Sequence, residues 1–171
     1  MRLLPAVLIG AAAIGWACWL AAVPALVRSA TSGPAVWAAA ATYRAGAVIC
    51  HQRDARSFHV AGVRMPVCTR CFGLYTGAAL GALAALGCLL ARLRRTTEAW
   101  RIPLARLRWI LAASAAPTLA AWLAEHVAAI GVPGPARAIA ALPLGAAVAA
   151  FVTCWAGGAA FHDTAPGSAL H

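Results

Sequence analysis

The sequence predicts an all-α fold: an integral membrane helical bundle of about four transmembrane helices, with a short interfacial helix and a Cys/His-rich hairpin loop between the first two spans. Three observations predict it. The chain is 63% apolar, with a mean hydropathy of +0.80. It carries only 14 basic and four acidic side chains, too few to cover a soluble domain of this length. Its apolar residues fall into four blocks of spanning length. We therefore treat residues 1–171 as a single membrane domain.

The first span is expected over residues 3–23, closed by Pro24. Its apolar run exceeds the roughly 7–15 residues of a signal-peptide core, which favours an uncleaved helix. The other three spans are expected over these ranges: 72–91, 107–130 and 138–161.

Three glycines recur at every fourth position of the second span: Gly73, Gly77 and Gly81. On a helix they share one face, and small residues at this spacing let another helix approach closely. The pattern predicts a packing face, for which a homo-oligomer or another membrane partner is one candidate.

A long insertion separates the first two spans. Residues 31–49 begin with helix-start residues and a proline and continue as an alanine run, which predicts a helix lying at the membrane interface or, alternatively, a fifth short span. Residues 50–71, which we call the cap, contain two β-prone runs separated by Ala61-Gly62. This pattern predicts a tight hairpin that folds Cys50 and His51 back toward the Cys68-Thr-Arg-Cys71 turn.

The distribution of arginine predicts the orientation. Six arginines crowd into residues 92–108, whereas six others spread over residues 28–70. By the positive-inside tendency the denser loop is cytoplasmic, which places both termini inside and the cap outside a plasma (inner) membrane crossed several times. The net charge of +10 is then expected to meet anionic membrane lipid rather than nucleic acid.

The cap cysteines predict a metal site. A Cys-x-x-Cys turn directs two thiolates to one ion, so Cys68 and Cys71 are expected as ligands, with Cys50 as the third. His51 is the expected fourth ligand and His59 its reserve. Zinc is the default ion, with iron or copper suited to the same soft donors. No c-type haem is expected because Phe72 stands where the attachment motif needs histidine, and no nucleotide cofactor is expected.

Two other interpretations of the same cysteines remain open. Cys68 and Cys71 stand beside Arg70 at the start of a helix, which favours thiolates, so the pair could exchange disulfides with Cys50 as the resolving thiol. Alternatively, Cys50 could form a structural disulfide with Cys68 or Cys71 in a protein without catalytic activity. The residues name no reaction.

A second polar cluster is expected beneath the cap. An ionisable group in a span usually faces the protein interior and has a partner, so Glu125 is expected to pair with Arg137, or with Arg53 or Arg56. These charged residues are candidates for supporting the metal centre or contacting an anion: Arg56, Arg70, Glu125 and Arg137.

The cap motif resembles one known family. "CHQ", "RSF" and "PVCTRCFGLYTG" together are similar to the domain-of-unknown-function family numbered 2085, small predicted membrane proteins of bacteria and archaea. The resemblance is strong over residues 50–81 and weaker over 117–145. It implies a membrane protein and supplies motif positions without roles: Cys50, His51, Arg56, Cys68, Arg70, Cys71, Gly73, Tyr75 and Gly77.

Overall fold

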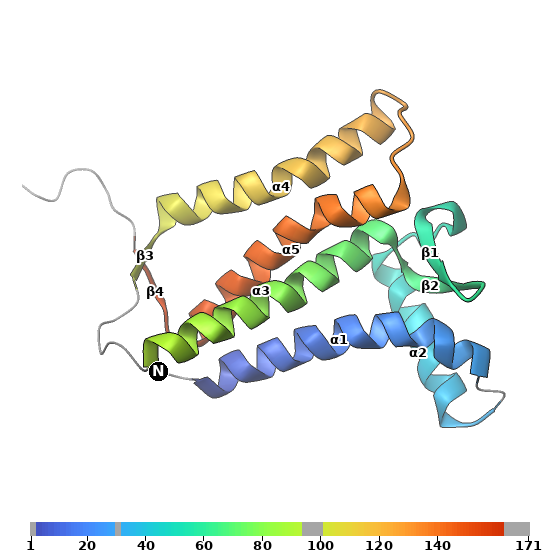
Figure 1. Cartoon of the computed structure of the whole chain (residues 1–171), viewed down its shortest axis with the longest axis horizontal. Coiled ribbons are helices and arrows are strands. Elements are labelled where there is room, and N and C mark those ends of the chain that lie inside the picture. The colour runs from blue at the N-terminus through green and yellow to red at the C-terminus, as the bar shows by residue number, and fades with distance from the viewer. Residues whose placement is uncertain (1–2, 30–31, 94–100, 163–171) are drawn as a thin grey trace, which may run out of the picture.

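The computed structural model describes residues 3–29, 32–93 and 101–162 and has the predicted helical architecture. Four helices are long and apolar enough to cross a membrane: α1 (Leu3–Ser29), α3 (Thr69–Leu93), α4 (Leu104–His126) and α5 (Gly134–Ala156). At 1.5 Å per residue even the shortest spans about 35 Å, more than the roughly 30 Å hydrocarbon core of a bilayer. In Figure 1 they lie side by side in the order α4, α5, α3, α1.

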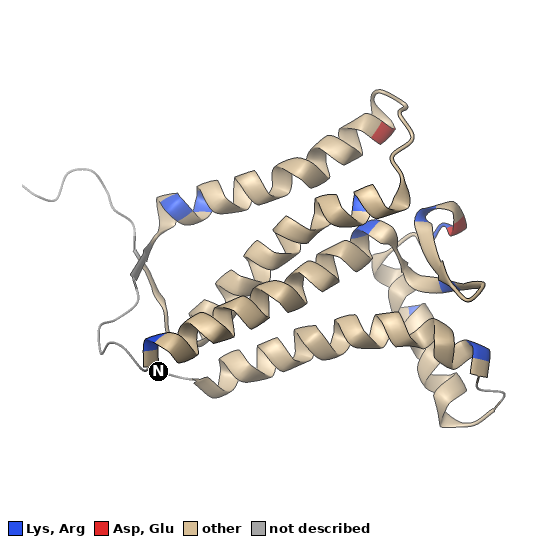
Figure 2. Ribbon diagram, in the orientation of Figure 1, with Lys and Arg blue, Asp and Glu red and all other residues tan. Residues whose placement is uncertain are grey.

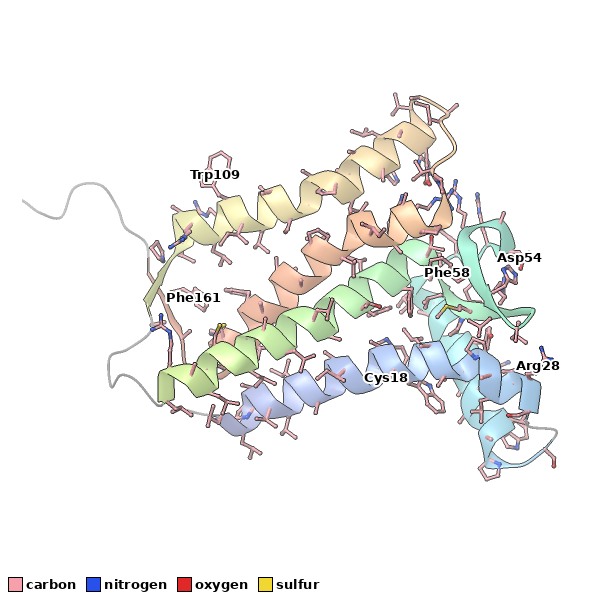
Figure 3. All side chains as sticks on the ribbon, in the orientation of Figure 1. Cys18, Arg28, Asp54, Phe58, Trp109 and Phe161 are labelled. Atoms are coloured by element: carbon pink, nitrogen blue, oxygen red, sulfur yellow. The ribbon has the colours of Figure 1, made fainter. Side chains whose placement is uncertain are left out.

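The distribution of exposed and charged side chains suits a lipid environment. Large apolar residues face outward from the spans, and Trp109, 77% exposed, points away from the bundle (Figure 3). Arginines gather at the two ends of the bundle and acidic residues at the end that holds residues 50–71, while the middle of the helices carries no charge in the described residues (Figure 2). Such an apolar band between polar ends would be unfavourable in water and is stable in hydrocarbon.

The glycine face of α3 receives α5 of the same chain. A Cβ on Gly73, Gly77 or Gly81 would overlap backbone carbonyl groups of α5, and a Cβ on Gly145 would overlap that of Leu74. Backbones that approach this closely gain dispersion contact along the whole interface, as in small-xxx-small helix pairs. The predicted packing mode is therefore confirmed, and the neighbour is intramolecular. A second molecule could use this face only if α5 moved away.

The boundary expected at Pro24 was wrong. Helix α1 continues through this proline to Ser29. Proline removes one backbone donor and crowds the preceding turn, but Pro24 is fully buried and its fixed φ is compatible with a helix. The third and fourth spans also begin and end about four residues earlier than expected. Pro135 sits in the first turn of α5, where proline is well tolerated.

Helix α2 (Pro34–Ile49) forms where an interfacial helix was expected. Its 16 residues extend about 24 Å, less than the hydrocarbon core, and it packs across the end of α1. Trp19 of α1 donates a 2.8 Å hydrogen bond to Thr42 Oγ1 of α2, which joins the two helices.

The cap consists of the short 3-10 helix η1 (Asp54–Arg56) and the antiparallel strands β1 (Ser57–Val60) and β2 (Val63–Cys68). The predicted hairpin is confirmed. Ala61 and Gly62 both have positive φ (52° and 82°), as a two-residue turn matching the strand twist requires. Arg28 at the end of α1 donates a 2.8 Å hydrogen bond to the Ala61 carbonyl, which fixes the turn to the bundle.

The opposite end of the bundle holds a feature that the sequence pattern did not predict. Strands β3 (Arg101–Pro103) and β4 (Ala160–His162) pair in parallel. Each has only three residues, too few for an alternating pattern to be recognised. Part of the arginine-rich connection, residues 94–100, lies outside the described residues, as does the tail after His162.

Candidate metal centre

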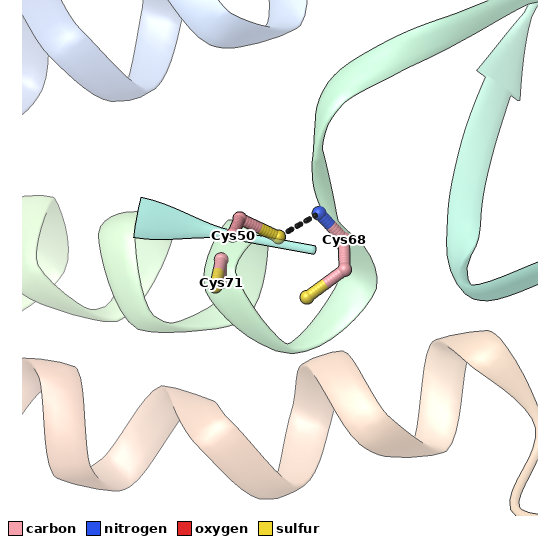
Figure 4. Close-up of side chains that lie close together, drawn as sticks. All are labelled: Cys50, Cys68 and Cys71. Atoms are coloured by element: carbon pink, nitrogen blue, oxygen red, sulfur yellow. Dashed lines mark hydrogen bonds between the residues drawn. The ribbon is translucent and has the colours of Figure 1, made fainter. Parts of the chain in front are cut away.

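Three thiols meet at the junction between the cap and the bundle (Figure 4). Cys50 follows the last residue of α2, Cys68 ends β2, and Cys71 lies in the first turn of α3. Their sulfur atoms all lie within 4.8 Å of one another, and each cysteine is a free thiol. The structure therefore brings together the three cysteines that were expected to share one site, although 17 residues separate Cys50 from Cys68.

Hydrogen bonds hold the segment after Cys50 against β2. Gln52 Nε2 donates to the carbonyl oxygens of Tyr43 and Pro66, each at 2.7 Å. Arg64 of β2 donates to the Gln52 carbonyl, and Tyr43 donates to the Arg64 carbonyl. Gln52 has a φ of 43°, in the left-handed region, which turns the chain sharply after Cys50. Sequence reasoning missed this anchoring role. The sequence did offer one indication of it: Gln52 is a neutral polar residue directly after Cys50 and His51 in an otherwise apolar chain.

The thiols lie in an apolar setting with polar groups at one side. Cys50 is 8% exposed and packs with Leu20 and Val67, and Tyr75 is one of the aromatic side chains against this cluster. The backbone N–H of Cys68 donates to Cys50 Sγ at 3.2 Å. Cys50 Sγ therefore lies among apolar side chains, with one backbone donor and the two other thiols within reach.

The surroundings of Cys68 favour the thiolate form of its side chain. A hydrogen bond from the Cys71 thiol is the largest cause, and backbone N–H groups of Cys71 and Arg70 act in the same direction. Burial opposes them, but the net effect lowers the pKa of the Cys68 thiol to about 5. The thiolate is the form of cysteine that binds metals and attacks disulfides, so this lowered pKa is compatible with either chemistry at neutral pH.

The two histidines proposed as further ligands differ in their position relative to the thiols. His51 follows Cys50 directly and lines the cavity beside the thiols, but its ring nitrogens are not part of the close sulfur cluster. His59 lies on β1, with Nε2 3.0 Å from Asp54 Oδ1, in an exposed pair. The role of His51 as a fourth ligand stays a prediction, and its position is the nearer of the two.

A buried ion-pair network lies next to the thiols, as the sequence suggested. Glu125, only 4% exposed, pairs through Oε1 with Arg137 Nε and through Oε2 with Arg70 Nη2 at 3.2 Å. The pairing of Glu125 with Arg137 is confirmed, and Arg70 rather than Arg53 or Arg56 is the second partner. The network joins the ends of α3, α4 and α5, so Arg70, which lies between Cys68 and Cys71, is tied to α4 directly and to α5 through Glu125.

Cysteines and charged residues line one cavity of about 290 Å³ at this end of the bundle. Arg56, predicted as a possible supporting group, is among its lining residues together with Arg53, which belongs to the same turn. The cavity is lined by these residues: Ile49, Cys50, His51, Gln52, Arg53, Arg56, Cys68, Thr69, Arg70, Cys71, Glu125, His126 and Arg137.

The fold and this cavity define a small multi-span membrane protein with a cluster of three thiols at one end of its bundle. Residues 50–151, more than half of the chain, match the family described as "Predicted membrane protein (DUF2085)", and the chain belongs to this family. The match begins at Cys50, the first cysteine of the cluster.

One curated relative is similar over a short stretch. The uncharacterized protein MJ1492 of Methanocaldococcus jannaschii is 51% identical over 39 residues, which are 23% of this chain and 25% of that protein. The chain thus matches a quarter of the relative's length. No solved structure matches this chain.

Proposed function

We propose that Cys50, Cys68 and Cys71 bind one soft metal ion, with zinc as the first candidate, at the extracytoplasmic end of the bundle. The observation that carries the proposal is the convergence of three thiol sulfurs within 4.8 Å. In a tetrahedral zinc site with Zn–S bonds of 2.3 Å, neighbouring sulfurs are about 3.8 Å apart. Small rotations of the three side chains would reach that geometry.

The surroundings of the thiols support this proposal. Three thiolates and a divalent ion carry a net negative charge, which Arg70 at the start of α3 would partly balance. His51 lies at the cavity wall, where it could supply the fourth ligand. The low pKa of Cys68 supplies one ligand that is already deprotonated at neutral pH.

Metal content of the purified protein tests the proposal. We expect about one zinc ion per chain, measured by elemental analysis, and loss of most of it in each single variant Cys50→Ser, Cys68→Ser and Cys71→Ser. Cys18→Ser, in the exposed part of α1, is the matched control and should keep the metal. Metal-free wild-type protein, purified without chelators, would overturn the proposal.

A thiol-disulfide exchange function is the second candidate. The low pKa of Cys68 favours it, since a thiolate attacks disulfides, and Cys71 lies within reach as the second thiol of the pair. Metal-free protein in which Cys68 and Cys71 form a reducible bond, detected by thiol counting before and after reduction, would favour this function over metal binding.

A further inference from the structure

The cavity beside the thiols has an excess of positive charge. Four arginines line it, whereas Glu125 is the one acidic residue among its lining residues. Arg70 and Arg137 share that carboxylate. Even if both are counted as fully paired with it, one positive charge remains on the pair, in addition to the charges of Arg53 and Arg56.

Arg53 and Arg56 donate no hydrogen bond within this cavity, although the charge of Arg56 also acts on Glu125. Neither guanidinium forms a hydrogen bond or ion pair with another residue in the described part of the chain. Both belong to the turn around η1, which the Gln52 anchor and the hairpin hold over the thiols. Two guanidinium groups without a hydrogen-bonded partner at the wall of a small cavity suit an oxyanion, which can accept from both.

The charge and the size of the cavity narrow the class of ligand. A carboxylate would neutralise one of the free guanidiniums, whereas a phosphate group carries up to two negative charges and enough acceptor oxygens for two bidentate partners. The volume of about 290 Å³ lies just below the usual range for ligand pockets, which suits a phosphate with a small substituent. Ile49 adds an apolar wall on the side of α2.

We propose that this cavity binds a phosphate group, held by Arg53 and Arg56 beside the thiol cluster. The phosphate belongs either to a soluble compound or to a lipid headgroup, because the cavity lies at the end of the bundle where headgroups are found. The inference goes beyond the proposed function and does not depend on it, because Arg53 and Arg56 carry their positive charges whether or not the thiols hold a metal ion.

Calorimetric titration tests the inference on the full-length, metal-loaded protein in nanodiscs of neutral phosphatidylcholine. Inorganic phosphate is expected to bind, and the double variant Arg53→Gln/Arg56→Gln to bind it at least tenfold more weakly. Arg44→Gln, an exposed arginine of α2 outside the cavity, removes charge at the same end and should leave binding unchanged.

Nanodiscs that contain phosphatidic acid, whose headgroup is a phosphate monoester, distinguish the two sources. Competition of this lipid with inorganic phosphate, or binding of the lipid alone, identifies a headgroup as the ligand, and undiminished phosphate binding identifies a soluble phosphate. Absence of binding to both probes would overturn the inference, as would equal binding by the wild-type protein and the double variant.

Metal analysis of the same samples separates this inference from the proposed function. The double arginine variant should retain its metal, while Cys68→Ser should lose it. Phosphate binding that depends on Arg53 and Arg56 in a protein without metal would contradict the metal proposal and leave the phosphate site standing. Metal-loaded protein that binds neither probe would contradict the phosphate site and leave the metal proposal standing.

Discussion

The three cap cysteines reach one another from different kinds of backbone. Cys50 is extended, Cys68 ends a strand, and Cys71 is helical. Their environments differ accordingly: Cys50 accepts a backbone hydrogen bond from Cys68, and Cys68 is the thiol whose charge the neighbouring groups stabilise. One residue of the cluster therefore carries most of the thiolate character before any metal binds.

The pH dependence of alkylation reports this thiolate directly. Because the pKa of Cys68 is lowered to about 5, its reactive form is present above that pH and is lost as the pH falls through it. In metal-free protein, the rate of Cys68 alkylation by iodoacetamide, followed by mass spectrometry, should therefore have its midpoint near pH 5. In Cys71→Ala, which removes the largest stabilising hydrogen bond, the midpoint should move up toward the roughly 8.5 of a free thiol. A wild-type midpoint near that value would contradict the assignment.

Among the charged residues, Glu125 is the one whose replacement should most destabilise the end of the bundle that holds the thiols. Glu125→Gln leaves two arginines without their carboxylate, and removal of one partner from a buried ion pair costs on the order of 3 kcal/mol. We expect a clear drop in the thermal unfolding midpoint in detergent. Asp54→Asn, which breaks the exposed pair with His59, is the control and should have a much smaller effect. Equal effects of both variants would contradict the network's role.

Local sequence patterns predicted these residue-level contacts unevenly. The meeting of Cys50 with Cys68 could be predicted in outline, because the turn at Ala61-Gly62 folds the chain between them back on itself, but the register shift between Ser57 and His59 could not. Only one of the two partners of Glu125 could be predicted. Arg137 is near Glu125 in sequence. Arg70 reaches Glu125 through the packing of α3 on α5, a non-local contact that no short pattern encodes.

At the scale of the elements, the interface between α3 and α5 holds the bundle together. Gly77→Ala places a Cβ against the Leu142 backbone, so the helices must separate, and overpacking of this kind costs about 1–3 kcal/mol. Gly87→Ala is the control on the same helix, because a Cβ there meets nothing within 4 Å and alanine favours the helix. Thermal unfolding in detergent should show a loss of stability for Gly77→Ala only. No loss in that variant would contradict the close packing.

The glycine spacing predicted a packing face but could not identify what covers it. Several apolar helices of this chain carry small residues that would fit, and the choice of α5 depends on Gly145 reaching the Leu74 backbone at the same time. The continuation of α1 through Pro24 has a similar explanation. Burial of the proline in the bundle outweighs its local tendency to end a helix.

At the scale of the whole molecule, the two ends of the bundle have different characters. One end holds the cap, the thiols and the Glu125 network, and the other holds the β3–β4 pair and the arginine-bearing helix ends (Figures 1 and 2). The number and order of the spans followed from hydropathy, because apolar length is a property of the sequence alone. The parallel pairing of β3 with β4 could not be predicted in this way, since it joins segments almost 60 positions apart.

Labelling from outside the cell tests the predicted orientation. In a background in which all native cysteines are replaced, Ser32→Cys at the cap end should react with a membrane-impermeant maleimide in intact cells. Leu93→Cys at the opposite end should react only after permeabilisation, because the denser arginine loop beside it is expected to face the cytoplasm. The inverse labelling pattern would reverse the orientation and place the metal site inside.

X-ray absorption spectroscopy at the zinc edge tests the central claim most directly, since it reports the atoms bound to the ion. For the protein loaded with one zinc per chain, we predict three sulfur neighbours at about 2.3 Å and one nitrogen or oxygen neighbour at about 2.0–2.1 Å. Cys68→Ser should lose a sulfur neighbour or the ion itself. A first shell of nitrogen and oxygen alone would show that the ion lies elsewhere and would contradict the three-thiolate metal centre.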